Sequence, residues 1–96
     1  MKGIVSVIGK DRLGIIADVS TTLTKQSVNI VDLSQTILDE YFTMVMLVDL
    51  ETMECSFKEL SDELEKCGQR LGLSVKIQHQ SIFDAMHNLE YGGFNR

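Results

Sequence analysis

The order in which two hydrophobic periodicities alternate along this chain constrains its fold more than any other feature. Four segments carry the apolar or alternating pattern of β-strands, and two longer segments between them carry the stripe of an amphipathic helix. The expected strands and helices, in chain order, are 3–9, helix 12–26, 28–38, 41–50, helix 57–71 and 73–80. This order predicts an α+β fold of the ferredoxin-like βαββαβ type, in which one antiparallel sheet carries both helices on a single face. A short C-terminal helix at 81–89 is expected to follow.

Local signals mark where several of these elements begin and end. Ser56 and Glu59 form the Ser-x-x-Glu pattern of a capping box, and Gly72 stands where a helix C-terminus favours a left-handed residue. Asp11 is the expected N-cap of the first helix, because its side-chain oxygen can accept a backbone N–H. Residues 39–40 are the expected tight turn between the second and third strands. The first and third strands are the most continuously apolar and are expected in the middle of the sheet.

The third expected strand is apolar on both of its faces. One face carries Phe42, Met44, Met46 and Val48. The other face carries Tyr41, Val45 and Leu47. Only one face can lie beneath the two long helices, and leaving the other wet would forgo about 25 cal/mol per Å² of apolar area. Either the C-terminal helix or a second copy of the chain is therefore expected to cover it, and the shortness of that helix favours a homodimer.

The size and charge of the chain limit its class. Its 96 residues suffice for one domain at 1–80, followed by a C-terminal helix and tail at 81–96 that is expected to fray from Tyr91. The longest apolar run, 44–48, is far shorter than the ~20 residues of a membrane span, and no signal-peptide core follows Met1. A formal net charge of −5 argues against nucleic acid as a partner.

Side chains suited to catalysis or metal binding are sparse. Cys55 and Cys67 have no C-x-x-C spacing, which predicts free thiols in the reducing cytoplasm. His79 and His87 match no standard metal-ligand spacing, and the serines and threonines around Ser20 have no histidine nearby in the sequence to activate them. The sequence therefore predicts a protein that is not an enzyme and that uses no metal or cofactor.

The densest group of candidate ligand-binding residues is the turn from the first strand into the first helix, residues 9–14. Its two glycines allow a sharp bend and close approach of a ligand, and the free N–H groups at a helix start attract an anion such as a carboxylate. Asp11 can meet an ammonium group, and Asn29 offers both a donor and an acceptor. Together these groups suit a small zwitterion. The alternative is that the glycines serve only the turn and the packing of the helix on the sheet.

Residues 5–17, VSVIGKDRLGIIA, followed by Asn29-Ile30, resemble the signature of ACT domains, small βαββαβ modules that bind amino acids and regulate metabolic enzymes. The resemblance covers residues 2–80, and residues 78–87 further resemble the C-terminus of free-standing bacterial ACT proteins. Leu13 departs from the pattern, because many members carry proline there. The resemblance implies a homodimer that binds its ligand between two domains and acts on a separate protein partner. The ligand-binding residues that it implies are Asp11, Arg12, Leu13, Gly14, Ile15, Asn29 and Ile30.

Two other functions fit the same fold. Acylphosphatases share the βαββαβ order and use an arginine and an asparagine, roles that Arg12 and Asn29 can take, although Asp11 would repel an acyl phosphate. A ligand-free pairing module is the second alternative. It would form a stable dimer that no metabolite perturbs.

Overall fold

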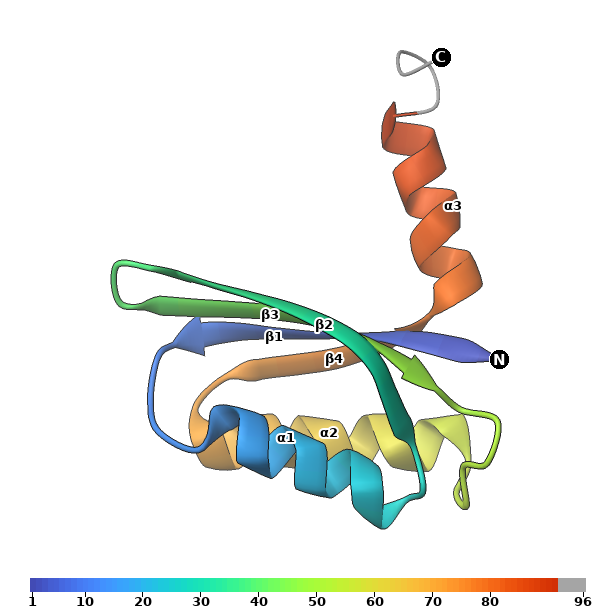
Figure 1. The fold of residues 1–96 in the computed structure, drawn as a ribbon, viewed down its shortest axis with the longest axis horizontal. Helices are drawn as coiled ribbons and strands as arrows, with labels where there is room; N and C mark the ends of the chain where they lie inside the picture. The colour runs from blue at the N-terminus through green and yellow to red at the C-terminus, as the bar shows by residue number, and fades with distance from the viewer. Residues whose placement is uncertain (92–96) are drawn as a thin grey trace.

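The computed structural model describes residues 1–91 of the chain, with side chains described through residue 85. The elements, shown in Figure 1, are β1 (Lys2–Lys10), α1 (Ile15–Lys25), β2 (Asn29–Leu38), β3 (Tyr41–Asp49), α2 (Phe57–Leu71), β4 (Ser74–His79) and α3 (Gln80–Tyr91). The predicted ferredoxin-like βαββαβ fold with an added C-terminal helix is confirmed. The tail was expected to fray from Tyr91; Tyr91 is the last residue of α3, and residues 92–96 lie outside the described residues.

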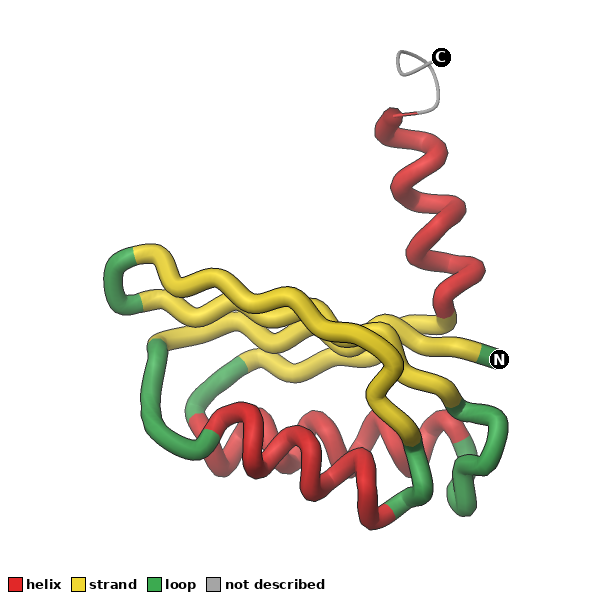
Figure 2. The backbone as a smooth tube through the Cα atoms, in the orientation of Figure 1, coloured by secondary structure: helices red, strands yellow, loops and turns green. Residues whose placement is uncertain are grey.

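The four strands form one antiparallel sheet in the order β2-β3-β1-β4 (Figure 2). The two most apolar strands, β1 and β3, are therefore central, as the sequence predicts. The turn between β2 and β3 consists of residues 39–40, and Asp39 takes a left-handed conformation with φ 56°, which aspartate tolerates better than most residues. Leu38 pairs directly with Tyr41, so this turn fixes the hairpin register as far as Asp32 opposite Leu47; between Asp32 and Ile30 the register shifts by one residue.

Helices α1 and α2 both cover one face of the sheet, which we call the helix face; the opposite face is the outer face (Figure 1). Alternate residues of the central strands point between the sheet and the helices and are buried there. The buried side chains include Val5, Val7, Phe42, Met44, Met46 and Val48 from the strands and Val19, Leu23, Leu60, Leu64 and Cys67 from the helices. The core is thus a single layer between the sheet and the helices, and the start of α1 packs against it.

The ends of α2 follow the sequence signals, whereas the start of α1 does not. The capping box is present, since the Glu59 N–H donates to Ser56 Oγ and the Ser56 N–H donates to Glu59 Oε1, each at 3.1 Å. Gly72 ends α2 in the left-handed conformation. The prediction that Asp11 caps α1 is wrong: Gly14 is the N-cap, with φ 89°, and the helix begins three residues later than expected. The cause is tertiary, because the Asp11 N–H donates to the Glu40 carbonyl at 2.8 Å and holds the chain against the β2–β3 turn.

Helix α3 rises from the end of β4 on the outer side of the sheet, opposite α1 and α2 (Figure 1). Its contacts with the rest of the described chain are mainly to β1 and β4 near its own start. Tyr41 and Val45, on the outer face of β3, remain exposed. A C-terminal helix folded over that face was one of the two covers expected from the sequence. In the described residues, α3 does not cover the outer face of β3.

Candidate functional site

A hollow of about 370 Å³ lies on the helix face, between the start of α1 and the nearby end of β2. Ten residues from three parts of the chain line it. They are Asp11, Arg12, Leu13, Gly14, Ile15, Ile16 and Ala17 from the turn and first helical residues, Gln35 and Ile37 from β2, and Phe42 from β3. Five of the seven residues nominated from the sequence, at 11–15, are brought together here.

The other two nominated residues, Asn29 and Ile30, do not belong to this hollow. They lie at the opposite end of β2, where Asn29 pairs with Asp49 and Ile30 with Val48. The structure therefore also separates Arg12 from Asn29, the two residues that an acylphosphatase-like site would need to bring together.

Three lining residues that the sequence reasoning missed are Gln35, Ile37 and Phe42. The hairpin register contains the signal that could have found two of them. Once the turn is placed at residues 39–40, Ile37 must lie opposite Phe42, and Phe42 also pairs with Gly9 at the end of β1. Because Gly9 leads directly into the turn, its cross-strand neighbours were the residues to nominate from the sequence.

The turn that forms one wall of the hollow is tied to two other parts of the fold. Besides the hydrogen bond from Asp11 to Glu40, the Lys10 ammonium lies 3.8 Å from the Glu40 carboxylate in an exposed ion pair. The Arg12 guanidinium donates to the Leu71 carbonyl, a long contact of 3.4 Å at the C-terminal end of α2. Arg12 thus supports the turn by joining it to α2.

Gly9 allows the chain to pass close to the end of α2. A Cβ at this position would lie 2.3 Å from Leu73 Cδ2 and 3.3 Å from Leu73 Cα. Leu73 Cδ2 is the end of a flexible side chain that can move aside, so the tighter constraint is the approach to Leu73 Cα, and glycine is favoured where β1 enters the turn.

The start of α1 lines the hollow and has backbone donors without a partner in the helix. Among the described residues no side chain caps this helix, and the earliest intrahelical bond runs from the Asp18 N–H to the Gly14 carbonyl at 2.9 Å. The N–H groups of residues 15–17 precede that bond and have no acceptor within the helix. They form the positive end of the helix dipole, and Asp11 also lines this hollow. The site thus offers separate places for a negative and a positive group beside an apolar wall.

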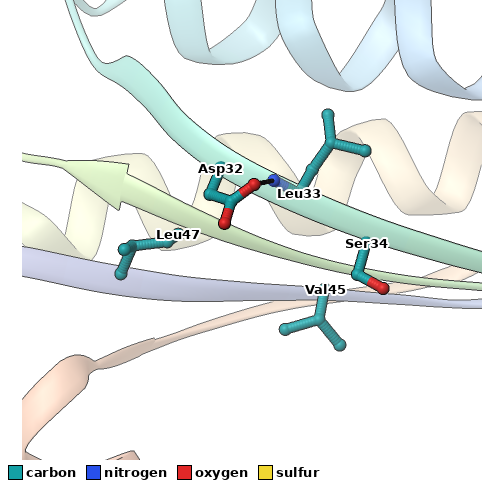
Figure 3. Close-up of a pocket in the computed structure, with 5 residues that line it drawn as sticks. All are labelled: Asp32, Leu33, Ser34, Val45 and Leu47. Atoms are coloured by element: carbon teal, nitrogen blue, oxygen red, sulfur yellow. Dashed lines mark hydrogen bonds between the residues drawn. The ribbon is translucent and has the colours of Figure 1, made fainter.

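A second, smaller hollow of about 200 Å³ lies over β2 and β3 and is lined by Asp32, Leu33, Ser34, Val45 and Leu47. Figure 3 shows that the Asp32 carboxylate turns back to its own strand, where it accepts a 2.9 Å hydrogen bond from the Leu33 N–H. Its one charged group is already engaged with the backbone, and apolar side chains form much of the rest. This hollow therefore has fewer groups to orient a polar ligand than the one beside α1.

The residues considered for metal binding have other surroundings. The His79 ring stacks on Phe57, with ring centroids 4.0 Å apart, and so joins the end of β4 to the start of α2. Within the part of the chain that is described, no group of three or more histidine, cysteine or acidic side chains is placed to hold a metal ion. None of the helices described over residues 1–91 combines the length and apolar character needed to cross a membrane.

Comparison with known proteins places this chain and its fold in a class. A family model described as the ACT domain matches residues 3–78, so the chain is an ACT-domain protein, which is a regulatory, small-molecule-binding fold. A UPF0237 protein from Clostridium acetobutylicum is 51% identical over 89 residues, which are 93% of this chain and 100% of that protein. A UPF0237 protein from Methanocaldococcus jannaschii is 49% identical and covers 90% of this chain and 96% of its own length. The chain belongs to this family of small, free-standing ACT-domain proteins.

A solved structure agrees with this assignment. The chain superposes on an ACT domain protein from Streptococcus pneumoniae with a TM-score of 0.76 and 44% sequence identity, over 86% of this chain and 93% of that one. The resemblance drawn from residues 5–17 is thereby confirmed, as is the fold.

Proposed function

We propose that this protein is a non-catalytic regulator that binds an amino acid or a similar small zwitterion in the hollow beside α1, at an interface with a second copy of the chain, and signals to a partner protein. The observation that carries the proposal is the coincidence of an uncapped helix start with an apolar wall in one open hollow. Membership of the ACT-domain family supports it. The two free thiols, at Cys55 and Cys67, agree with a cytoplasmic protein.

Each part of a zwitterion has a counterpart in the hollow. The ligand's carboxylate accepts hydrogen bonds from the N–H groups of residues 15–17. Its ammonium group is met by the carboxylate of Asp11 or the amide oxygen of Gln35. Its side chain packs on Ile37 and Phe42. A volume of about 370 Å³ is at the small end of the range of ligand pockets, which fits a metabolite of this size.

A second copy of the chain completes the site. The hollow adjoins β2, an edge strand whose outer backbone groups have no strand partner among the described residues. Leu13 at its rim is 93% exposed, and Ile37 is more than half exposed. Because an exposed leucine and isoleucine beside an unpaired strand edge favour association, we assign the β2 edge to a homodimer that encloses the ligand.

The signal leaves the site through the contacts of the turn. A ligand can shift an equilibrium only by binding one state better than another. The turn that holds the ligand is bonded through Asp11 to Glu40, at the tip of the β2–β3 hairpin. Closure of the turn around a ligand is therefore transmitted to the hairpin tip, which is exposed and available to a partner protein.

A thermal-shift panel of the twenty amino acids tests this function. A ligand at 100 times its Kd adds about 2.7 kcal/mol to the free energy of unfolding. For a domain of this size that is a rise in Tm of roughly ten degrees or more. We expect one amino acid or a few related ones to give such a rise.

A matched pair of variants locates the binding. Ile16→Glu puts a carboxylate into the first turn of α1, where it suits the helix dipole but repels a ligand carboxylate. Thr21→Glu adds the same charge to the exposed side of α1, outside the hollow. The proposal requires that Ile16→Glu abolish the shift and that Thr21→Glu retain it. A flat panel with a stable wild-type dimer would instead identify a ligand-free pairing module.

A further inference from the structure

The hollow beside α1 has an apolar base and apolar sides. Ile15 and Phe42 line it although both are buried, so they form its base. Ile16 from α1 and Ile37 from β2 line it as well, and both are exposed. A part of a ligand that enters between these four side chains therefore exchanges water for aliphatic and aromatic carbon, which favours an apolar group.

The charged side chains that line the hollow come from two adjacent residues of the turn. They are Asp11 and Arg12, and every other lining residue among those described is uncharged. The Arg12 guanidinium already donates to the Leu71 carbonyl at 3.4 Å. Asp11 thus supplies the one carboxylate among the described lining residues, and the one cationic group there is engaged with the end of α2.

The chemistry of an α-amino acid assigns the Asp11 carboxylate to the ligand's ammonium group. The ammonium and the carboxylate of an amino acid share one carbon, so the groups that meet them must lie close together. In the proposed function, on which this inference rests, the N–H groups of residues 15–17 meet the carboxylate, and Asp11 lies in the turn that leads into them. A charged partner also suits an ammonium group better than the neutral amide of Gln35. A lysine or arginine side chain on the ligand then has no counter-charge left in the hollow.

Acidic and neutral polar ligand side chains fare no better. An acidic one would have to draw Arg12 away from the Leu71 carbonyl, beside the negative charges of Asp11 and of Glu40, to which the turn is bonded. A neutral polar one has Gln35 as the single uncharged polar side chain among the described lining residues. Its remaining donors and acceptors would be desolvated without a partner, which costs affinity.

We infer that the ligand is an amino acid with a large apolar side chain, of the leucine, isoleucine, methionine and phenylalanine class, and that Ile37 and Phe42 determine this preference. Each fully buried CH2 group tightens binding about fourfold. Leucine has three more carbon atoms than alanine, and the hollow is open, so only part of that gain is realised. We therefore expect leucine to bind roughly tenfold or more tightly than alanine.

Calorimetric titration of the full wild-type chain with isosteric amino acids tests the inference. Leucine and asparagine have nearly the same size and shape, as do methionine and glutamine, so polarity alone separates each pair. We expect the apolar member to have a Kd lower by roughly ten- to a hundredfold. The series alanine, 2-aminobutyrate, norvaline and norleucine isolates apolar size, and the Kd should fall at each step by up to about fourfold.

A matched pair of variants assigns the preference to the wall from β2. Ile37→Asp places a carboxylate in the hollow at a position that is more than half exposed in the wild type. Thr36→Asp adds the same charge at the next residue, on the opposite face of the strand and outside the hollow. Ile37→Asp should move the ratio of the Kd values for leucine and lysine at least tenfold in favour of lysine. Thr36→Asp should keep the wild-type ratio, and circular dichroism verifies that both variants are folded.

The outcomes separate this inference from the function on which it rests. An asparagine, glutamine or charged amino acid that binds the wild type more tightly than its apolar counterpart would overturn the inference and leave the proposed function in place. So would a Kd that stays constant from alanine to norleucine, or a leucine-to-lysine ratio that Ile37→Asp does not move. No binding of any of the twenty amino acids would overturn both.

Discussion

Replacing Gly14 with alanine tests the conformation that the ligand-site turn imposes on the chain. Gly14 has φ 89° and ψ 2°, a left-handed conformation that costs a residue with a Cβ about 1–2 kcal/mol. In the described part of the chain no heavy atom lies within 4 Å of an added Cβ, so the expected loss comes from the backbone rather than from a collision. We expect Gly14→Ala to lower the free energy of unfolding by about that amount.

Gly72→Ala is the matched control for this variant. Gly72 is also left-handed, with φ 72°, and an added Cβ there again meets no described atom within 4 Å. Both variants should lower Tm by roughly 4–16 °C, since 1 kcal/mol corresponds to about 4–8 °C in a domain of this size. Asparagine at either position should recover part of the loss, because it tolerates the left-handed region better than alanine.

Ligand binding separates the two variants. Gly14 sets the direction of the N–H groups of residues 15–17, whereas Gly72 lies at the end of α2 and does not line the hollow. Gly14→Ala should therefore weaken amino-acid binding in calorimetric titration, and Gly72→Ala should leave it unchanged. Wild-type stability of Gly14→Ala, or an equal loss of binding in both variants, would contradict this expectation.

Three further predictions concern the scaffold. Leu64→Ala, in the fully buried core, should cost about 2–5 kcal/mol and lower the urea midpoint with an unchanged slope. Hydrogen bonds from Ser56, first from its backbone N–H and then from its hydroxyl, lower the pKa of Glu59 below its ordinary 4.5. This contribution is present above pH 4.5 and is lost as the pH falls through the lowered pKa, so Glu59→Gln should be less stable than wild type at pH 7 and converge with it in acid. Burial, together with the charges of Glu59 and Glu63, raises the pKa of the Cys55 thiol above 9.0; iodoacetamide should modify it slowly at pH 8, and Glu63→Gln should speed that reaction.

The order of elements could be read from the sequence because its signals are local. The capping box at Ser56, the glycine at position 72 and the alternation along β3 depend on residues close together in the chain. The start of α1 was misplaced because a distant bond, from Asp11 to Glu40, decides it. No local pattern near Asp11 reports that contact.

The candidate site was predicted in part for the same reason. Its turn, residues 11–15, is contiguous and could be nominated from its glycines and its helix start. The opposite wall depends on strand register, which brings Gln35 and Ile37 to the hollow and leaves Asn29 at the far end of β2. The course of α3 away from the sheet could not be read from its own short sequence, since it depends on what the rest of the fold leaves uncovered.

An NMR titration that follows the backbone amides of the wild-type chain tests the central claim most directly. Amino acids that raise Tm are added singly to labelled protein, together with their amine-free and carboxylate-free analogues. The account predicts that the largest shifts fall on residues 14–17, with smaller ones at Gln35 and Ile37, and that analogues lacking the carboxylate produce none. Shifts centred on Asn29 and Ile30, or no response to any of the twenty amino acids at millimolar concentration, would contradict it.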